Sequence, residues 1–156
     1  MDVIDFRPAT GKDVNELFNL LNSLSDEVKK FFHPHPFDKR TLEQILTSKK
    51  DHYFVLTVNK KIIGYSMLRF YVYKIPSFGV CIRKDYENHG YGNLMTEKTM
   101  KKAIEIGYKE VILNVHEENS RAIDLYERIG FKAVQKNPDT REIKMKKSLA
   151  PNSFFF

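Results

Sequence analysis

The sequence has few cysteines and no long apolar segment. It contains a single cysteine, Cys81, which excludes an intramolecular disulfide. No apolar run is long enough to span a bilayer, and no apolar segment near Met1 is followed by a small-residue cleavage site. We therefore expect a cytoplasmic protein whose core forms without covalent staples.

An arginine-rich block is also absent, although the chain is basic. Its formal net charge is +6 and its sequence pI is about 9.3. The basic residues are mostly lysines that alternate with Glu and Asp, which is typical of a solvated surface. A polyanionic small ligand would still benefit from this field. We expect neither a nucleic-acid partner nor a membrane partner.

The length of 156 residues fits one domain with its own core. We expect a single domain over residues 1–149 and a loose tail over residues 150–156. The tail ends in Phe154, Phe155 and Phe156, which could dock on a neighbouring surface or simply be adhesive. The sequence leaves a monomer and a homodimer open.

The first half of the chain alternates between strand and helix patterns. Residues 3–7 have the alternation of a half-buried strand, and the apolar residues at 14, 17, 18, 20, 21 and 24 form one helical stripe. Ser25 begins a shorter helix, prolines interrupt residues 33–37, and Asp38 begins another helix. Three strands of an antiparallel meander are expected at residues 53–58, 62–71 and 78–82, with turns at 59–61 and 73–77.

Residues 82–92 join the last of these strands to a helix over residues 93–104. Gly90 and Gly92 allow positive φ or a close approach by a ligand, and the first amides of the helix have no partner within it. Together with the helix dipole, these amides favour a phosphate or pyrophosphate. A plain turn would use the same glycines, so this motif requires support from the rest of the chain.

The second half continues with one strand, one helix and a hairpin. Gly107 ends the preceding helix, and residues 111–115 form a strand that a right-handed crossover places parallel to residues 78–82. Asn119 or Ser120 caps a helix that Gly130 ends, and residues 131–134 and 142–145 form the hairpin. The expected fold class is therefore α/β, with a mixed sheet flanked by helices.

Two segments of the chain resemble the GNAT (GCN5-related N-acetyltransferase) superfamily. They are residues 78–92, FGVCIRKDYENHGYG, and residues 119–131, NSRAIDLYERIGF. The order of the other elements fits as well. The resemblance implies a mixed sheet that is splayed open between the strands at residues 80–82 and 111–115, and it implies that acetyl-CoA, the co-substrate, lies in that gap.

The resemblance also implies which residues contact acetyl-CoA. The pantetheine arm would bond to the backbone of the strand, and the pyrophosphate would rest on amides of the glycine turn, which agrees with the physical interpretation of that turn. The expected cofactor-binding residues are Val80, Cys81, Ile82, Glu87, Asn88, His89, Gly90, Tyr91, Gly92, Asn119 and Tyr126.

The chain departs from the family pattern at two positions of the turn. The family usually has Gln or Arg where this chain has Glu87, and often Gly where it has Asn88. Asn tolerates left-handed backbone better than most residues, so the turn survives. Glu87 is expected to turn outward and pair with Arg83 or Lys84, away from the pyrophosphate.

Tyr126 matches the family tyrosine that protonates the departing thiolate, and it is our expected catalytic residue. The alternative is a core tyrosine on the apolar face of its helix. Asn119 matches a cofactor-contacting asparagine and could equally be a plain helix cap. Cys81 is expected to be a small core residue beside the pantetheine, without an activated thiolate.

The general base is not identified. Ribosomal-protein acetylases of the family resemble this chain at residues 125–128, yet they carry Glu where it has Asn114. His116 lies on the same sheet face and could substitute, or it could be a surface residue at the strand end. His33 and His35 could contact the acceptor, pack in the fold or bind a metal, although their spacing is poor support for a metal site and we expect none.

The resemblance thus implies an N-acetyltransferase in which a primary amine attacks acetyl-CoA directly. The unidentified acceptor is expected to be a small molecule, with protein or peptide Nα-acetylation as the alternative. A non-catalytic acyl-CoA-binding module is a further possibility, which Tyr126 argues against. A Rossmann dinucleotide site is excluded, because no third glycine follows Gly92 at the required spacing.

Overall fold

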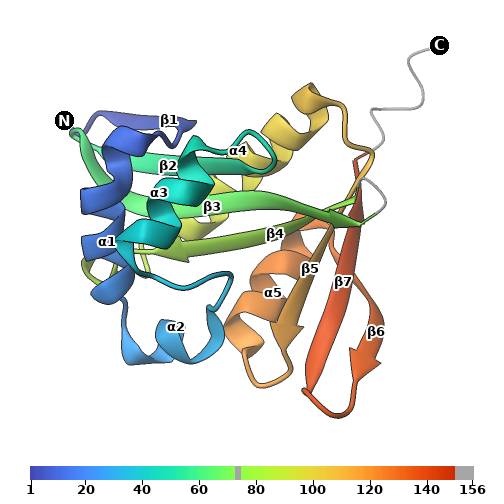
Figure 1. Ribbon diagram of the computed structural model, residues 1–156. Coiled ribbons are helices and arrows are strands. Elements are labelled where there is room, and N and C mark those ends of the chain that lie inside the picture. Colours follow the sequence, from blue (N-terminus) through green and yellow to red (C-terminus); the bar gives the residue numbers. More distant parts are fainter. Residues whose placement is uncertain (73–74, 150–156) are drawn as a thin grey trace.

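The computed structural model describes residues 1–72 and 75–149, and their strands join in one sheet (Figure 1). The seven strands have the order β1-β2-β3-β4-β5-β7-β6. They are β1 (Ile4–Pro8), β2 (His52–Val58), β3 (Lys61–Val72), β4 (Ile75–Ile82), β5 (Glu110–His116), β6 (Lys132–Asn137) and β7 (Glu142–Ser148). The helices are α1 (Val14–Asn22), α2 (Asp26–Phe31), α3 (Lys39–Thr47), α4 (Tyr91–Ile106) and α5 (Ser120–Ile129), with 3₁₀ turns η1 (Gly11–Asp13) and η2 (Lys84–Tyr86).

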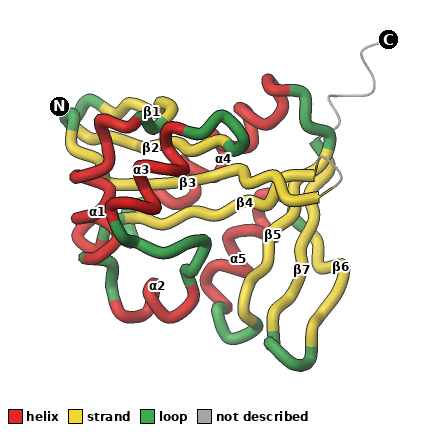
Figure 2. Tube along the Cα trace, in the orientation of Figure 1, coloured by secondary structure: helices red, strands yellow, loops and turns green. Residues whose placement is uncertain are grey.

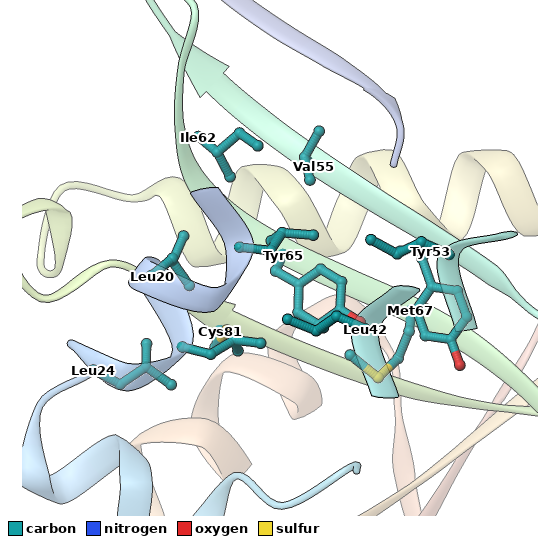
Figure 3. Close-up of a cluster of buried hydrophobic side chains, with 12 residues drawn as sticks. Leu20, Leu24, Leu42, Tyr53, Val55, Ile62, Tyr65, Met67 and Cys81 are labelled. Carbon is teal, nitrogen blue, oxygen red and sulfur yellow. The ribbon is translucent and has the colours of Figure 1, made fainter. Parts of the chain in front are cut away.

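Helices cover both faces of the sheet, which confirms the expected fold class. One core cluster combines leucines of α1 and α3 with residues of β2, β3 and β4, and Figure 3 shows Cys81 in it among Leu20, Leu24 and Leu42. On the other face, α4 and α5 pack against a cluster that includes Phe54, Phe78 and Tyr126. Since β2 is covered on both sides, its residues from Tyr53 onwards are all buried.

The sheet opens between β4 and β5. Strands β3 and β4 pair along most of their length, whereas the parallel ladder between β4 and β5 places only Ser77 opposite Ile112 in the described residues. The two strands begin side by side and then diverge toward their carboxyl ends (Figure 1). This is the splay that the resemblance implies, and it leaves one edge of β4 free beyond Ser77.

The turn expected at residues 73–77 was placed too far along the chain. Residues 73 and 74 lie outside the described residues, but β4 begins at Ile75 and Pro76 lies opposite Phe70 of β3. Proline and serine are typical of turns, which suggested the later start. A proline is tolerated near the beginning of a strand, where it removes only one ladder donor, and the irregular register between Phe70 and Val72 accommodates it.

The expected helix ends are confirmed where a polar cap or a glycine marks them. The side chains of Ser25, Asp38 and Asn119 each accept an amide at the start of α2, α3 and α5. Gly107 and Gly130 end α4 and α5 in the left-handed conformation. Helix α4 begins at Tyr91, two residues before the expected Asn93, so Gly90 is its N-cap.

Helix α4 is fixed to the sheet by a buried polar contact. The hydroxyls of Ser66 on β3 and Thr99 on α4 lie 2.8 Å apart, and both residues are fully buried. Thr99 also donates to the carbonyl of Met95, which satisfies its hydrogen. This contact holds the helix that begins at the glycine turn in a fixed position on β3. Among the described residues, no helix has the length and apolar character needed to cross a membrane.

Candidate active site

A cleft of about 340 Å³ lies in the opening of the sheet. It is lined by residues of β4, the glycine turn, the start of α4, the end of β5, α5 and α2. Ten of the eleven expected cofactor-binding residues line it: Val80, Cys81, Ile82, Glu87, Asn88, Gly90, Tyr91, Gly92, Asn119 and Tyr126. The exception is His89, whose Nδ1 instead contacts the carbonyl oxygen of Glu87 at 2.6 Å.

The turn between β4 and α4 has the backbone of an anion site. Asn88 and Gly90 are left-handed, with φ of 65° and 83°, so the turn keeps a left-handed residue at position 88 although that residue is not glycine. In the described chain, the amides of Asn88, His89 and Gly90 donate to no protein group, and the α4 ladder begins with the bond from Leu94 to Gly90. The amides of residues 88–93 are therefore available to an anion.

The two glycines contribute to this site in different ways. An added Cβ on Gly90 would meet nothing within 4 Å, so space does not require a glycine there. The positive φ of Gly90 is what favours glycine at this position. A Cβ on Gly92 would lie 3.9 Å from Ile82 and 4.0 Å from Leu125, which is ordinary contact. Gly92 therefore leaves space at the floor of the cleft, and that space could be filled without straining the backbone.

Glu87 does not pair with Arg83 or Lys84, contrary to expectation. Its carboxylate accepts a hydrogen bond of 2.9 Å from the Ser25 hydroxyl, while Arg83 pairs with Asp85 at 3.0 Å. The sequence pattern did not predict the 3₁₀ turn η2, which has Arg83 as its N-cap and contains Asp85, the partner of Arg83. Glu87 thus joins the glycine turn to Ser25, the N-cap of α2.

Tyr126 is both a core residue and a cleft residue. Its side chain is 9% exposed and makes edge contacts with the rings of Phe78 and Phe131. Burial raises the pKa of the phenol to about 12, and the nearby Cys81 adds to the rise. In the described chain no protein group hydrogen-bonds the hydroxyl, so its proton is free for a molecule in the cleft.

Asn119 and Cys81 occupy the positions expected of them. The Asn119 carboxamide oxygen accepts the amide of Ala122 at 3.4 Å while the residue also lines the cleft, so the cap and a ligand contact are compatible. Burial raises the pKa of the Cys81 thiol, which keeps it protonated. Cys81 is therefore a packing residue, not a nucleophile.

Asn114 and His116 both line the cleft from the same face of β5. The His116 Nδ1 accepts the amide of Glu118 at 3.1 Å, so the neutral ring carries its proton on Nε2. That nitrogen can donate to a ligand but has no lone pair with which to accept a proton. The ring also lies against Phe31 of α2, with centroids 5.3 Å apart, which closes the cleft on that side.

The cleft includes residues that the sequence pattern did not single out. Glu27 lines it from α2, while Arg121 and Arg128 line it from α5 together with Leu125. Residues 121, 125 and 128 have the spacing of one helical stripe, and Leu125 precedes Tyr126 in the sequence. This stripe therefore borders the position of Tyr126, and the spacing could have indicated the two arginines. Nothing local marks Glu27, because α2 reaches the cleft only through the tertiary fold.

His33 and His35 are not among the residues that line the cleft, so acceptor contact by either imidazole is not supported. Instead, His35 is held by two hydrogen bonds, from Nδ1 to the carbonyl of Pro36 at 2.7 Å and between Nε2 and the Tyr65 hydroxyl at 2.9 Å. The first bond requires the proton on Nδ1, so Nε2 accepts from Tyr65. This pair fastens the segment after α2 to the sheet.

In the described residues, no cluster of His, Cys, Asp or Glu could hold a metal ion.

Acid should weaken this fastening. Burial lowers the pKa of His35, and the Arg69 charge acts in the same direction, although the bond to Pro36 opposes them. Between the lowered pKa and the ordinary value near 6.5, the unfolded chain binds more protons, so the free energy of unfolding falls as the pH drops. Urea unfolding at pH 7.5 and pH 5.5 should show a smaller loss for His35→Asn than for the wild type.

The exposed neighbour His33 provides the matched control for this measurement. His33→Asn should keep the wild-type dependence on pH, because the imidazole of His33 is on the surface, where its one hydrogen bond within the described chain is to the carbonyl of Lys30. An equal loss in the His35→Asn protein and the wild type would show that His35 does not contribute to the acid sensitivity.

Comparison with known proteins identifies the family. The family described as acetyltransferase (GNAT) domain matches residues 4–132 of this chain. Since the match covers most of the sequence, the chain belongs to the GNAT acetyltransferase family.

The curated relatives match only part of this chain, at 30% identity or less in the two cases described below. The chain is 30% identical to the mycothiol acetyltransferase of Corynebacterium aurimucosum over 78 residues, 47% of this chain and 26% of that protein. It is 26% identical to the [ribosomal protein bS18]-alanine N-acetyltransferase of Escherichia coli K12 over 101 residues, 64% of this chain and 66% of that protein. The chain thus spans a quarter of the first relative and just under two thirds of the second.

Solved structures share the fold. An acetyltransferase of the GNAT family from Streptococcus pneumoniae superposes with a TM-score of 0.78 at 23% identity, covering 94% of this chain and 99% of that chain. The ribosomal-protein-S18-alanine N-acetyltransferase from Escherichia coli superposes with a TM-score of 0.74 at 21% identity, covering 100% of both chains. These likenesses confirm the splayed mixed sheet flanked by helices.

Proposed function

We propose that this chain is an acetyl-CoA-dependent N-acetyltransferase, in which a primary amine attacks the thioester directly. One observation carries the proposal: the cleft that opens between β4 and β5 is lined both by a turn of amides and by the Tyr126 hydroxyl, and none of these groups has a hydrogen-bond partner among the residues that the structure describes. The first feature suits a pyrophosphate and the second suits a departing thiolate. Acetyl-CoA carries both groups in one molecule.

The residues of the cleft fit this co-substrate. The free edge of β4 at Val80 to Ile82 offers backbone donors and acceptors to the amides of the pantetheine arm, as another strand would. The amides of residues 88–93 suit the pyrophosphate, and Arg121 and Arg128 add positive charge on the adjacent stripe of α5. When bound, acetyl-CoA supplies the activated acetyl group.

Tyr126 would act on the leaving group. As the amine nitrogen bonds to the acetyl carbon, the carbon–sulfur bond breaks, and the Tyr126 hydroxyl donates its hydrogen to the sulfur. Burial raises the pKa of this phenol to about 12 and so makes it a weaker acid; its hydrogen bond to the charge on the sulfur is therefore the larger contribution, and a phenolate left by full transfer regains its proton from water. The chain also holds the two reactants together in one cleft, which supplies proximity.

The proton lost by the amine would leave through water. Asn114 cannot accept it, and the neutral His116 ring presents Nε2 as a donor. The acceptor itself is proposed to be a small-molecule amine, because Asn114 stands where the ribosomal-protein acetylases carry Glu. The relatives do not decide this point, since one is named for mycothiol and another for a ribosomal protein.

Release of free thiol from acetyl-CoA across a panel of amines tests the proposal. We expect thiol release that depends on both the amine and the enzyme. Tight binding of CoA in calorimetry, with no turnover of any amine or peptide, would instead favour a non-catalytic acyl-CoA-binding module.

A further inference from the structure

We infer that the acceptor is a primary monoamine whose amino group lies beside an apolar or aromatic body, received by Glu27, Phe31 and Phe32. This inference rests on the proposed function and narrows its acceptor. The three residues belong to α2 and its C-cap, and all of them line the cleft. Figure 2 shows α2 as a short helix near the start of α5, on the open side of the sheet.

Glu27 supplies one uncommitted negative charge. Two carboxylates line the cleft, Glu27 and Glu87, and Glu87 already accepts a hydrogen bond from Ser25. Glu27 makes no ion pair or hydrogen bond within the described residues. An alkylammonium group is the natural partner for such a carboxylate, since it donates charge-assisted hydrogen bonds; it must then lose one proton to water before its nitrogen attacks the acetyl carbon.

The wall next to Glu27 is aromatic. Phe31 lies one helical turn after Glu27, so both side chains occupy the same face of α2, and its ring packs against that of His116 on β5. Phe32 lies over Gly79 of β4, where an added Cβ would be 3.7 Å from the ring. Both phenylalanines are half-buried. An acceptor that covers them would remove apolar surface from water.

The same wall argues against other amines. A polyamine would bring a second positive charge, and among the described residues that line the cleft no carboxylate other than Glu27 is without a partner. An amino sugar would bring hydroxyls to a wall of phenylalanine rings, which offers few hydrogen-bond partners. The arginines that line the cleft, Arg121 and Arg128, lie on the stripe of α5 that contains Leu125, and their positive charges would repel a second ammonium group.

Steady-state kinetics with phenethylamine, ethylamine, spermidine and glucosamine tests the inference. We expect the highest kcat/KM for phenethylamine. Glu27→Gln should raise its KM by about 3- to 10-fold, the effect of one charged hydrogen bond to an exposed carboxylate, while the KM for acetyl-CoA changes less than about twofold. Asp26→Asn is the matched control, because Asp26 precedes Glu27 on α2 and does not line the cleft; it should leave both values unchanged.

A second variant tests the aromatic wall. Phe31→Ala should lower the preference for phenethylamine over ethylamine by about tenfold, the effect of roughly 1.4 kcal/mol of lost apolar contact. A peptide that begins with Phe is assayed as a further substrate. If its kcat/KM exceeds that of phenethylamine, the acceptor is the N-terminus of a polypeptide that begins with an aromatic residue.

The outcomes separate the inference from the proposed function. Better turnover of spermidine or glucosamine than of phenethylamine would overturn the inference and leave an N-acetyltransferase. An unchanged KM for phenethylamine in Glu27→Gln would also overturn it. A protein that binds acetyl-CoA but turns over no amine would reject the proposed function, and the inference with it.

Discussion

Gly92→Glu should abolish acetyl-CoA binding while the protein stays folded. The new side chain would begin at the floor of the cleft, where a Cβ meets only Ile82 and Leu125 at ordinary contact distances, and it would place a carboxylate among the amides of residues 88–93. That carboxylate would compete for the amides and repel the phosphates. We expect the Kd in calorimetry to rise more than about 100-fold, the effect of losing several charge-assisted hydrogen bonds.

Gly92 is a better position for this test than Gly90. A Glu at position 90 would occupy a φ of 83°, so a loss of binding could reflect backbone strain. Gly92→Ala is the control for the loss of glycine alone, and it should fold and bind acetyl-CoA more tightly than Gly92→Glu does. Near wild-type affinity in a folded Gly92→Glu protein, judged by circular dichroism and thermal unfolding, would remove the turn from the proposed site.

The glycine turn could be predicted because its signals are local. The apolar run before it, the two glycines and the helical period after it lie within about thirty residues of the chain, and each reflects a backbone property of its own segment. The structure accordingly has Gly90 in the left-handed region and α4 starting at Tyr91. The caps at Ser25, Asp38 and Asn119 are local signals of the same kind.

The partners of cleft residues could not be predicted, because they are distant in sequence. Ser25 and Glu87 are 62 residues apart, and no feature of either segment points to the other. Glu27 belongs to the cleft because the tertiary fold brings α2 to the opening, where Ser25 bonds to Glu87 and Phe31 packs on His116. The start of β4 was missed for a related reason: pairing with β3 overrides the turn propensity of Pro76.

Tyr126→Phe should lower kcat about 10- to 10⁴-fold, the range for one positioned acid with some replacement by water. The substitution removes only the hydroxyl, so the ring contacts with Phe78 and Phe131 remain. Because that hydroxyl has no partner in the described chain, its loss should scarcely affect stability or acetyl-CoA affinity. Rates must be measured where chemistry limits turnover, for example in a single-turnover assay.

A second tyrosine separates this role from ordinary packing. Tyr65 is fully buried and donates its hydroxyl hydrogen to His35, and it does not line the cleft. Tyr65→Phe should therefore lose about 1 kcal/mol of unfolding free energy for the missing hydrogen bond and keep its kcat. Tyr126→Phe should show the reverse pattern, with stability retained and turnover lost.

The pH profile provides an independent check on Tyr126. With its pKa raised to about 12 by burial, the phenol stays protonated throughout an assay between pH 6 and pH 10, so its ionisation should cause no alkaline fall in kcat. The ratio of wild-type to Tyr126→Phe rates should consequently be constant across that range. A kcat within twofold of the wild type would assign protonation of the thiolate to solvent, and Tyr126 would then be a core residue that borders the cleft.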